Sequence, residues 1–174
     1  MASPFGDIGP CDAVFNSISL GELHGVTVNY SEQTADHMTA AYGSSAKDKV
    51  YVGSECSVEC LMTESTIAQL NYCIGNGTVT ANELMVGSPV GTGLRSSAAQ
   101  LVLKPYIDGA VTATESKWIT FFVAAPLVEW SFQFNADGDR EYKCVFHCFR
   151  ASATVSGETY AVGDMFAIGY GQTS

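Results

Sequence analysis

Six cysteines have the clearest potential for chemistry in this chain, and four of them form two equally spaced pairs. The pairs are Cys56 with Cys60 and Cys144 with Cys148. Zinc sites usually gather thiolates two to four residues apart on a turn or knuckle. Both pairs lie in alternating, strand-like stretches, where residues i and i+4 are about 13 Å apart along the chain, so one pair cannot hold one ion. We therefore expect no metal, and free, mostly buried thiols that pack as small apolar residues.

Three other patterns that could carry chemistry are better explained without it. Residues 135–139, NADGD, resemble the start of a calcium loop, but the rest of the loop is missing, and Asp-Gly between alternating runs predicts a hairpin turn. The glycines at 91–93 and 169–171 lack the helix and lysine of a phosphate-binding loop. No G-x-S-x-G elbow marks a serine as a nucleophile. The sequence predicts neither an enzyme nor a bound cofactor.

The composition is that of an acidic globular protein with few charges. Of the 174 residues, 47% are hydrophobic and only 15% are charged, and the formal net charge is −10. Such a chain will not bind the phosphate backbone of a nucleic acid, although it could line a passage through which DNA slides. On composition alone, plain solubility is the better explanation of the acidity. The low charge fraction favours faces that are covered by partner subunits.

Targeting signals give an expectation about where the chain is made. The opening segment MASPFGDIGP has neither the basic stretch nor the apolar run of a signal peptide. No run approaches the roughly 18 apolar residues of a membrane span. We expect synthesis in a reducing cytoplasm and no membrane partner.

The stretch from Val50 to Gly75 predicts a half-buried strand that runs into a short helix. Side chains alternate between the two faces of a strand, so one small, apolar row should face the core and one mostly polar row should face away. The core row is Val50, Val52, Ser54, Cys56, Val58 and Cys60, and the polar row is Tyr51, Gly53, Glu55, Ser57, Glu59 and Leu61.

The helix is predicted over residues 64–74. Thr63 offers a hydroxyl as N-cap, and Glu64 places negative charge in the first turn, where the helix dipole favours it. An apolar stripe follows at helical spacing, and Gly75 can adopt the left-handed conformation that ends a helix. The stripe is Ile67, Leu70 and Ile74.

Short strands dominate the remaining chain. Residues 118–125, WITFFVAA, are apolar on both faces and predict the most buried strand, which Pro126 interrupts. Residues 129–134 and 140–150 alternate and predict a hairpin. Residues 1–10 predict an N-terminal arm. Residues 31–49 have little periodicity and predict a long loop, which either folds as an extended hairpin or is mobile.

These elements together predict a mainly β fold in a single domain, residues 1–174. Its expected architecture is an antiparallel β-sandwich or barrel with one flanking α-helix and a long early loop.

Three stretches in order carry a resemblance to a known family: residues 5–37, with their "strand, Leu-Gly, Gly-Val-Thr-Val" rhythm, residues 50–70, and the hairpin at 129–151. Together they resemble the tail tube (major tail) proteins of long-tailed bacteriophages. They cover well over half of the chain. The Gly-rich segment at 87–93 and the number of cysteines have no counterpart in the family pattern.

The resemblance implies a structural virion protein that forms hexameric rings, which stack into a hollow tube. Strands of neighbouring subunits would line an acidic lumen through which ejected DNA slides without specific binding. By position, the loop at 31–49 would bridge to the next ring. The residues expected at this inter-ring contact are Asp36, His37, Tyr42 and Lys47, and the candidates for the acidic lumen are Glu55, Glu59 and Glu129.

Further partners implied by the resemblance are the tape-measure protein, the initiator and terminator proteins and a possible sheath. The expected location is the virion tail, after synthesis in a bacterial host cytoplasm. Two alternatives stay open at this point. One is another phage structural β-protein, such as a head decoration or neck (tail-completion) protein; the other is a ligand-binding or hydrolytic β-sandwich, which would require a concave pocket with converging polar groups.

Overall fold

The computed structural model describes residues 10–38, 45–64, 66–87, 89–133, 141–152, 154–155, 158–159 and 163–169. For Glu64, residues 127–133 and the segments 154–155 and 158–159, only the backbone is described. The predicted N-terminal arm, apart from Pro10, and the predicted turn at 135–139 lie outside these residues.

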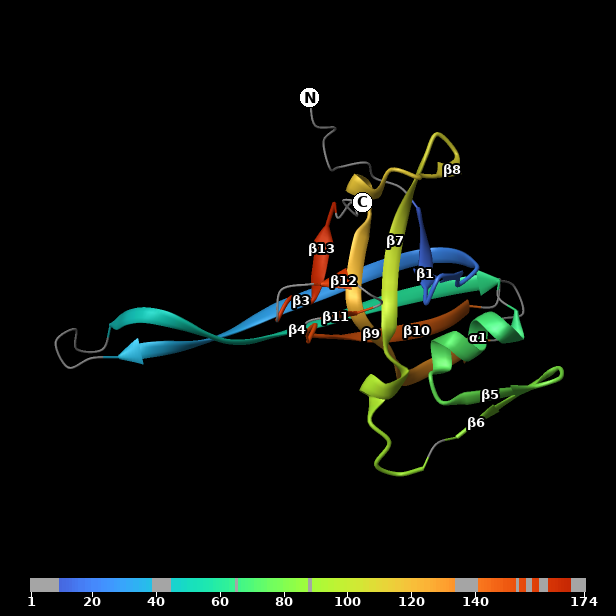
Figure 1. The fold of residues 1–174 in the computed structure, drawn as a ribbon, viewed down its shortest axis with the longest axis horizontal. Helices are drawn as coiled ribbons and strands as arrows, with labels where there is room; N and C mark the ends of the chain where they lie inside the picture. The colour runs from blue at the N-terminus through green and yellow to red at the C-terminus, as the bar shows by residue number, and fades with distance from the viewer. Residues whose placement is uncertain are drawn as a thin grey trace.

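One large antiparallel sheet forms most of the molecule (Figure 1). Its strand order is β2-β1-β7-β9-β10-β4-β3, and β13 and β8 pair with β9 and β7, respectively. The bounds are β1 Cys11–Phe15, β2 Ile18–Ser19, β3 Glu22–Met38, β4 Ala46–Glu64, β7 Ala99–Ile107, β8 Ala110–Val111, β9 Ile119–Gln133, β10 Glu141–Phe149 and β13 Phe166–Ile168.

The smaller elements lie around this sheet. Two further hairpins pair β5 (Gly77–Thr80) with β6 (Glu83–Val86), and β11 (Thr154–Val155) with β12 (Glu158–Thr159). The helix α1 spans Ile67–Ile74, and short 3-10 helices lie at Leu94–Ser97 and Glu115–Lys117. The predicted fold class, mainly β and antiparallel with one flanking α-helix, is confirmed for the part of the chain that is described.

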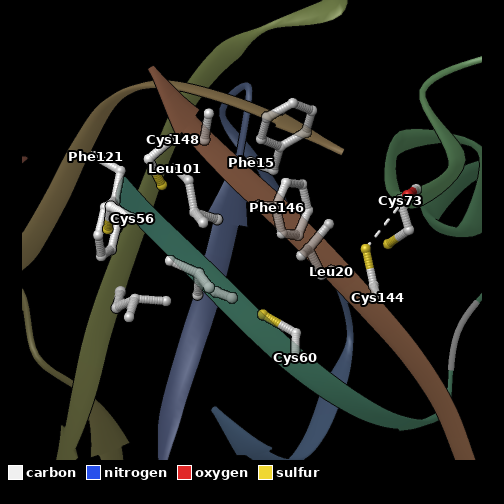
Figure 2. Close-up of a cluster of buried hydrophobic side chains, with 14 of the residues drawn as sticks. Phe15, Leu20, Cys56, Cys60, Cys73, Leu101, Phe121, Cys144, Phe146 and Cys148 are labelled. Carbon is white, nitrogen blue, oxygen red and sulfur yellow. Dashed lines mark hydrogen bonds between the residues drawn. The ribbon is translucent and has the colours of Figure 1, made fainter. Parts of the chain in front are cut away.

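The sheet folds over on itself, so that two sets of strands cross. In Figure 1, β1, β7, β9 and β13 run roughly up the page, whereas β3, β4 and β10 run across it. The side chains between the two sets form the hydrophobic core (Figure 2). Phe146 of β10 lies at its centre, fully buried, with its ring centroid 5.0 Å from that of Phe15 on β1. Orthogonal packing of this kind buries one face of each layer.

Alternate residues of β10 and of β4 from Cys56 to Met62 contribute to this core, as the alternating pattern predicts for this part of the strands. The buried residues of the two strands that belong to the core are Cys56, Val58, Cys60, Met62, Cys144, Phe146 and Cys148. All six cysteines are free, and all but Cys11 are buried. The interpretation of the cysteines as small apolar core residues is therefore confirmed.

The strand predicted as most buried is β9, and it is longer than predicted. Its residues from Thr120 to Ala125 are all buried, but the strand continues through Pro126 to Gln133. The pairing of β7 with β9 ends at Ala124, so beyond this point one edge of β9 has no partner among the described strands. Proline is tolerated at an unpaired edge because it has no N–H to donate to a ladder.

The helix starts later than predicted. The strand β4 continues to Glu64, which pairs with Glu22 of β3, so Thr63 cannot be the N-cap. Thr66 caps the helix instead: its Oγ1 accepts from the backbone N–H of Gln69, whose side chain in turn accepts from the N–H of Thr66. The sequence signal for this helix start is the T-x-x-Q pattern of a capping box. Gly75 ends the helix at φ 67°, as predicted.

The apolar stripe of α1 is only partly buried. Cys73 and Ile74 are buried against the core, whereas Ile67 in the first turn is 40% exposed. The buried end of the helix contacts β10, where the Cys144 thiol donates to the carbonyl oxygen of Cys73 at 3.3 Å (Figure 2).

Replacing Phe146 with alanine should remove the centre of the core. We expect the free energy of unfolding to fall by about 3–5 kcal/mol, because the lost contacts leave a cavity between the crossing layers. Urea denaturation followed by circular dichroism measures the change. Val52→Ala is the matched control, since Val52 is 63% exposed on the same sheet and should change stability by no more than about 0.5 kcal/mol. Equal effects of the two substitutions would contradict this assignment of the core.

Thr66→Ala should destabilise the protein by about 1 kcal/mol, because it removes the N-cap of α1. Thr66→Ser keeps the hydroxyl and should restore most of the loss. Thermal melting of the two variants and of Thr63→Ala tests the assignment; a larger effect at Thr63 than at Thr66 would indicate that the helix begins where the sequence pattern predicted it.

Candidate functional site

The most prominent surface feature is the hairpin formed by β3 and β4, whose strands are 17 and 19 residues long. Strands in globular proteins are usually 3–10 residues long. The half of the hairpin next to α1 covers the core, and the other half extends away from the body (Figure 1). Residues 31–49, predicted as a loop, are therefore mostly paired strand up to Met38 and from Ala46 onward, and the extended-hairpin alternative is the correct one.

The projecting half of the hairpin exposes apolar side chains. Val50 and Val52 were predicted to face the core, but they are 52% and 63% exposed because no second layer reaches this far. Tyr51 and Met38 are exposed as well. Isolated surface hydrophobics are ordinary, but several on one narrow extension indicate a surface that meets a partner.

A β-bulge is a second reason why the alternating pattern fails here. Gln33 pairs with Gly53 and Thr34 with Tyr51, so Val52 is an additional residue in β4. A one-residue slip exchanges the two faces of a strand. Tyr51 thus lies on the side of Ser54, to which its hydroxyl donates at 2.8 Å.

The residues expected at an inter-ring contact lie on this projecting half, insofar as they are described. Asp36 forms a salt bridge with Lys49 directly opposite on β4, with Nζ and Oδ1 3.1 Å apart. His37 and Lys47 are exposed on the same part of the hairpin, and Tyr42 lies outside the described residues. Their role at an inter-ring contact stays a prediction, and the sequence gave no sign of the Asp36–Lys49 pair.

The outer edge of β3 is open. Among the described strands, β3 pairs only with β4 and ends the strand order of the sheet. A strand edge presents a row of backbone N–H and C=O groups that can pair with another chain. Seventeen residues is a long edge, and it is continuous with the projecting half of the hairpin.

The face of the sheet that points away from the core carries two of the three predicted lumen carboxylates. Glu59 forms a salt bridge with Lys143 of β10 at 2.8 Å and accepts from Asn29 at 3.4 Å. Glu55 accepts from Gln33 at 3.4 Å. The side chain of Glu129 lies outside the described residues. The charge of Lys143 thus offsets that of Glu59 on this face, and a role of Glu55 and Glu59 in a lumen stays a prediction.

At the root of the projection, side chains from distant parts of the sequence meet. The Arg150 guanidinium donates to the hydroxyl of Tyr51 and lies 5.3 Å from the centre of its ring. Tyr30 packs edge-on against Phe166 of β13, and its hydroxyl donates to Glu32 at 2.8 Å. This hydrogen bond raises the pKa of Tyr30. Sequence reasoning missed these contacts, because no local pattern connects β4 with the end of β10 and with β13.

The described residues form no arrangement typical of an enzyme. A surface hollow of about 400 Å³ lies beside His147, along β3 and β4. It is a shallow depression, and its lining includes Cys56 as well as His147. Within the described segments, no group of three His, Cys, Asp or Glu side chains could hold a metal ion. No helix of the described chain is long and apolar enough to cross a membrane.

Comparison with solved structures shows a similar fold in a particle component. A chain of an extracellular contractile injection system, solved as the PVC sheath-tube complex in the extended state, matches with a TM-score of 0.54 at 7% identity, covering 81% of this chain and 85% of that one. A chain from the virion of a native gene transfer agent particle matches with a TM-score of 0.41 at 7% identity, covering 79% and 88%. No family model and no curated protein matches this sequence. At this identity the first likeness shows the fold alone, and the second is too distant to support an argument.

The Glu59–Lys143 pair should set the charge of its sheet face and add little stability. Both side chains are more than one third exposed, so a double-mutant cycle of Glu59→Gln and Lys143→Gln should give a coupling of about 0.2–1 kcal/mol that disappears in 1 M salt. Urea denaturation at low and high salt measures it. A coupling of several kcal/mol that resists salt would show that the pair is buried by something that covers this face.

Proposed function

We propose that this protein is a structural subunit of a phage-like tail, and specifically that it forms the tail tube by stacking in hexameric rings. The observation that supports this proposal best is the combination of an open β3 edge with a projecting, partly apolar hairpin. Neither feature is satisfied within one copy of the described chain. A fold similar to that of a chain in a sheath-tube complex supports the same conclusion.

In this proposal, copies of the chain join through backbone pairing. The edge of β3 would accept a strand of the neighbouring subunit, so that the sheets of six copies close into one wall. Closing a ring removes the open edges, which is the usual way to avoid uncontrolled strand addition. The net charge of −10 would require the contact to be built from apolar and backbone groups more than from charges.

The projecting hairpin would reach the adjacent ring. Its exposed valines and Tyr51 supply apolar contact area, and Asp36, His37 and Lys47 supply the polar rim that surrounds such a contact. The internal Asp36–Lys49 bridge would hold the strands together before assembly.

The polar face of β3 and β4 would line the bore. Glu55 is neutralised by no described cation, whereas Glu59 is paired with Lys143, so the lining would be mildly acidic. A surface of this kind repels DNA without a specific interaction. The tape-measure protein, the initiator and terminator proteins and a sheath are the further partners that a tail tube would have.

Assembly of the purified full-length chain tests the proposal. We expect rings or tubes in negative-stain electron microscopy and a sedimentation profile dominated by assemblies. Val52→Asp should leave the monomer folded but raise the concentration needed for assembly at least tenfold, because a charge buried in a contact costs more than about 1.4 kcal/mol.

The matched control is Met85→Asp on β6, a strand of the separate small hairpin. Met85 is 55% exposed, similar to Val52, but lies away from the projecting hairpin. Assembly should be unaffected by this change. A chain that stays monomeric in all assembly conditions, with and without candidate initiator and tape-measure proteins, would contradict the proposal.

A further inference from the structure

Two pairs of cysteines face each other across neighbouring strands. In the β4–β10 ladder, Cys56 lies directly opposite Cys148, and Cys60 directly opposite Cys144. Directly opposed residues of antiparallel strands have Cα atoms about 4.5–5.5 Å apart, which lies within the range of about 4.4–6.8 Å that a disulfide requires. Two cysteines of the same strand are too far apart to chelate one ion. Across the two strands, however, each of these four cysteines has another as its direct neighbour.

The surroundings distinguish the two pairs. The Cys144 thiol is directed to the helix, where it donates to the carbonyl oxygen of Cys73 (Figure 2). The Cys56 and Cys148 thiols instead interact with each other, and this interaction lowers the pKa of Cys56, although burial acts in the opposite direction. The same interaction, together with burial, raises the pKa of Cys148. Burial also raises the pKa of Cys60.

The Cys56–Cys148 pair lies close to a surface hollow. A depression of about 230 Å³ is lined by Tyr30, Ser54 and Met165, among others. Tyr30 is the partner of Cys56 across β3 and β4, and Ser54 is the next residue of β4 on the same face. Met165, whose sulfur accepts from the Ser54 hydroxyl at 3.1 Å, lies between the hollow and the core. The hollow of about 400 Å³ beside His147 is lined by Cys56 itself, whereas neither of these two hollows is lined by Cys60 or Cys144.

We propose that Cys56 and Cys148 are a redox-modification site, at which hydrogen peroxide converts two buried thiols into a cross-strand disulfide within the folded chain. The inference does not depend on the proposed function. The bond would tie β4 to β10 at the root of the projecting hairpin and would brace that hairpin on the body.

The chemistry balances with peroxide as the oxidant. The Cys56 thiolate attacks one peroxide oxygen, the O–O bond breaks, and hydroxide leaves and takes up the proton released by Cys56, which gives a sulfenic acid and water. Cys148 then attacks the Cys56 sulfur, the S–S bond forms and the S–O bond breaks, and the hydroxyl group leaves as a second water with the Cys148 proton. The thiols lose two electrons in total, and one peroxide is reduced to two waters.

Peroxide treatment of the native full-length chain, followed by alkylation, digestion without reductant and mass spectrometry, tests the proposal. We expect the number of free thiols to fall by two, a peptide that links Cys56 with Cys148, and recovery of the thiols with dithiothreitol. The oxidised chain should melt on the order of 10 °C higher, because the bridge closes a long loop.

Three variants separate this site from general oxidation. Cys60→Ala removes a member of the other pair and should leave the Cys56–Cys148 link intact. Cys148→Ser should stop the reaction at a sulfenic acid on Cys56, which dimedone traps, and Cys56→Ser should yield no link. The proposal is overturned if the wild-type chain, checked as folded by circular dichroism, shows no Cys56–Cys148 peptide. It is equally overturned if the Cys56–Cys148 disulfide forms only in denaturant, or if a Cys60–Cys144 disulfide forms as fast as the Cys56–Cys148 disulfide.

Discussion

The burial of one face of β4 and β10 against β1, β7 and β9 is the constraint on which the remaining structure depends. Phe146, Phe15 and the cysteines of both strands fill the space between two layers that cross. Small residues such as cysteine allow these layers to approach closely around the two aromatic rings. The helix α1 and the direction of β3 follow from this packing, because both are attached to β4.

The same constraint explains why the hairpin becomes exposed where it does. The strands β3 and β4 extend beyond the layer that covers them (Figure 1), and Val50 and Val52, beyond Ser54, are exposed. A bulge at Val52 increases the local twist at this point, and Arg150 and Tyr51 mark the boundary between body and projection. A single copy thus combines a well-packed core with a long open edge, and such a combination favours assembly over catalysis.

The buried cysteines acquire a second significance in this arrangement. The spacing of the four cysteines on β4 and β10 argues against a shared metal site within one strand, yet their register brings them together as two opposed pairs. Strand pairing thus decides whether a cysteine is an inert core residue or one member of a reactive pair. The neighbours distinguish the two pairs, since the Cys144 thiol donates to the carbonyl oxygen of Cys73 in the helix, whereas the Cys148 thiol interacts with Cys56.

Local patterns were sufficient to predict much of the fold. The alternation of residues 56–60 and 142–149, the apolar run at 119–125 and the glycine that ends α1 are properties of short segments, and the sequence by itself determined them. The exposure of Val50 and Val52 and the continuation of β9 through Pro126 were decided only by the tertiary structure. Both depend on where a neighbouring strand ends. The hydrophobic periodicity of a strand does not indicate where its partner strand ends. Likewise, the sequence offered Glu59 and Asp36 without their partners, because only pairing across strands joins Lys143 to Glu59, Lys49 to Asp36 and Cys148 to Cys56.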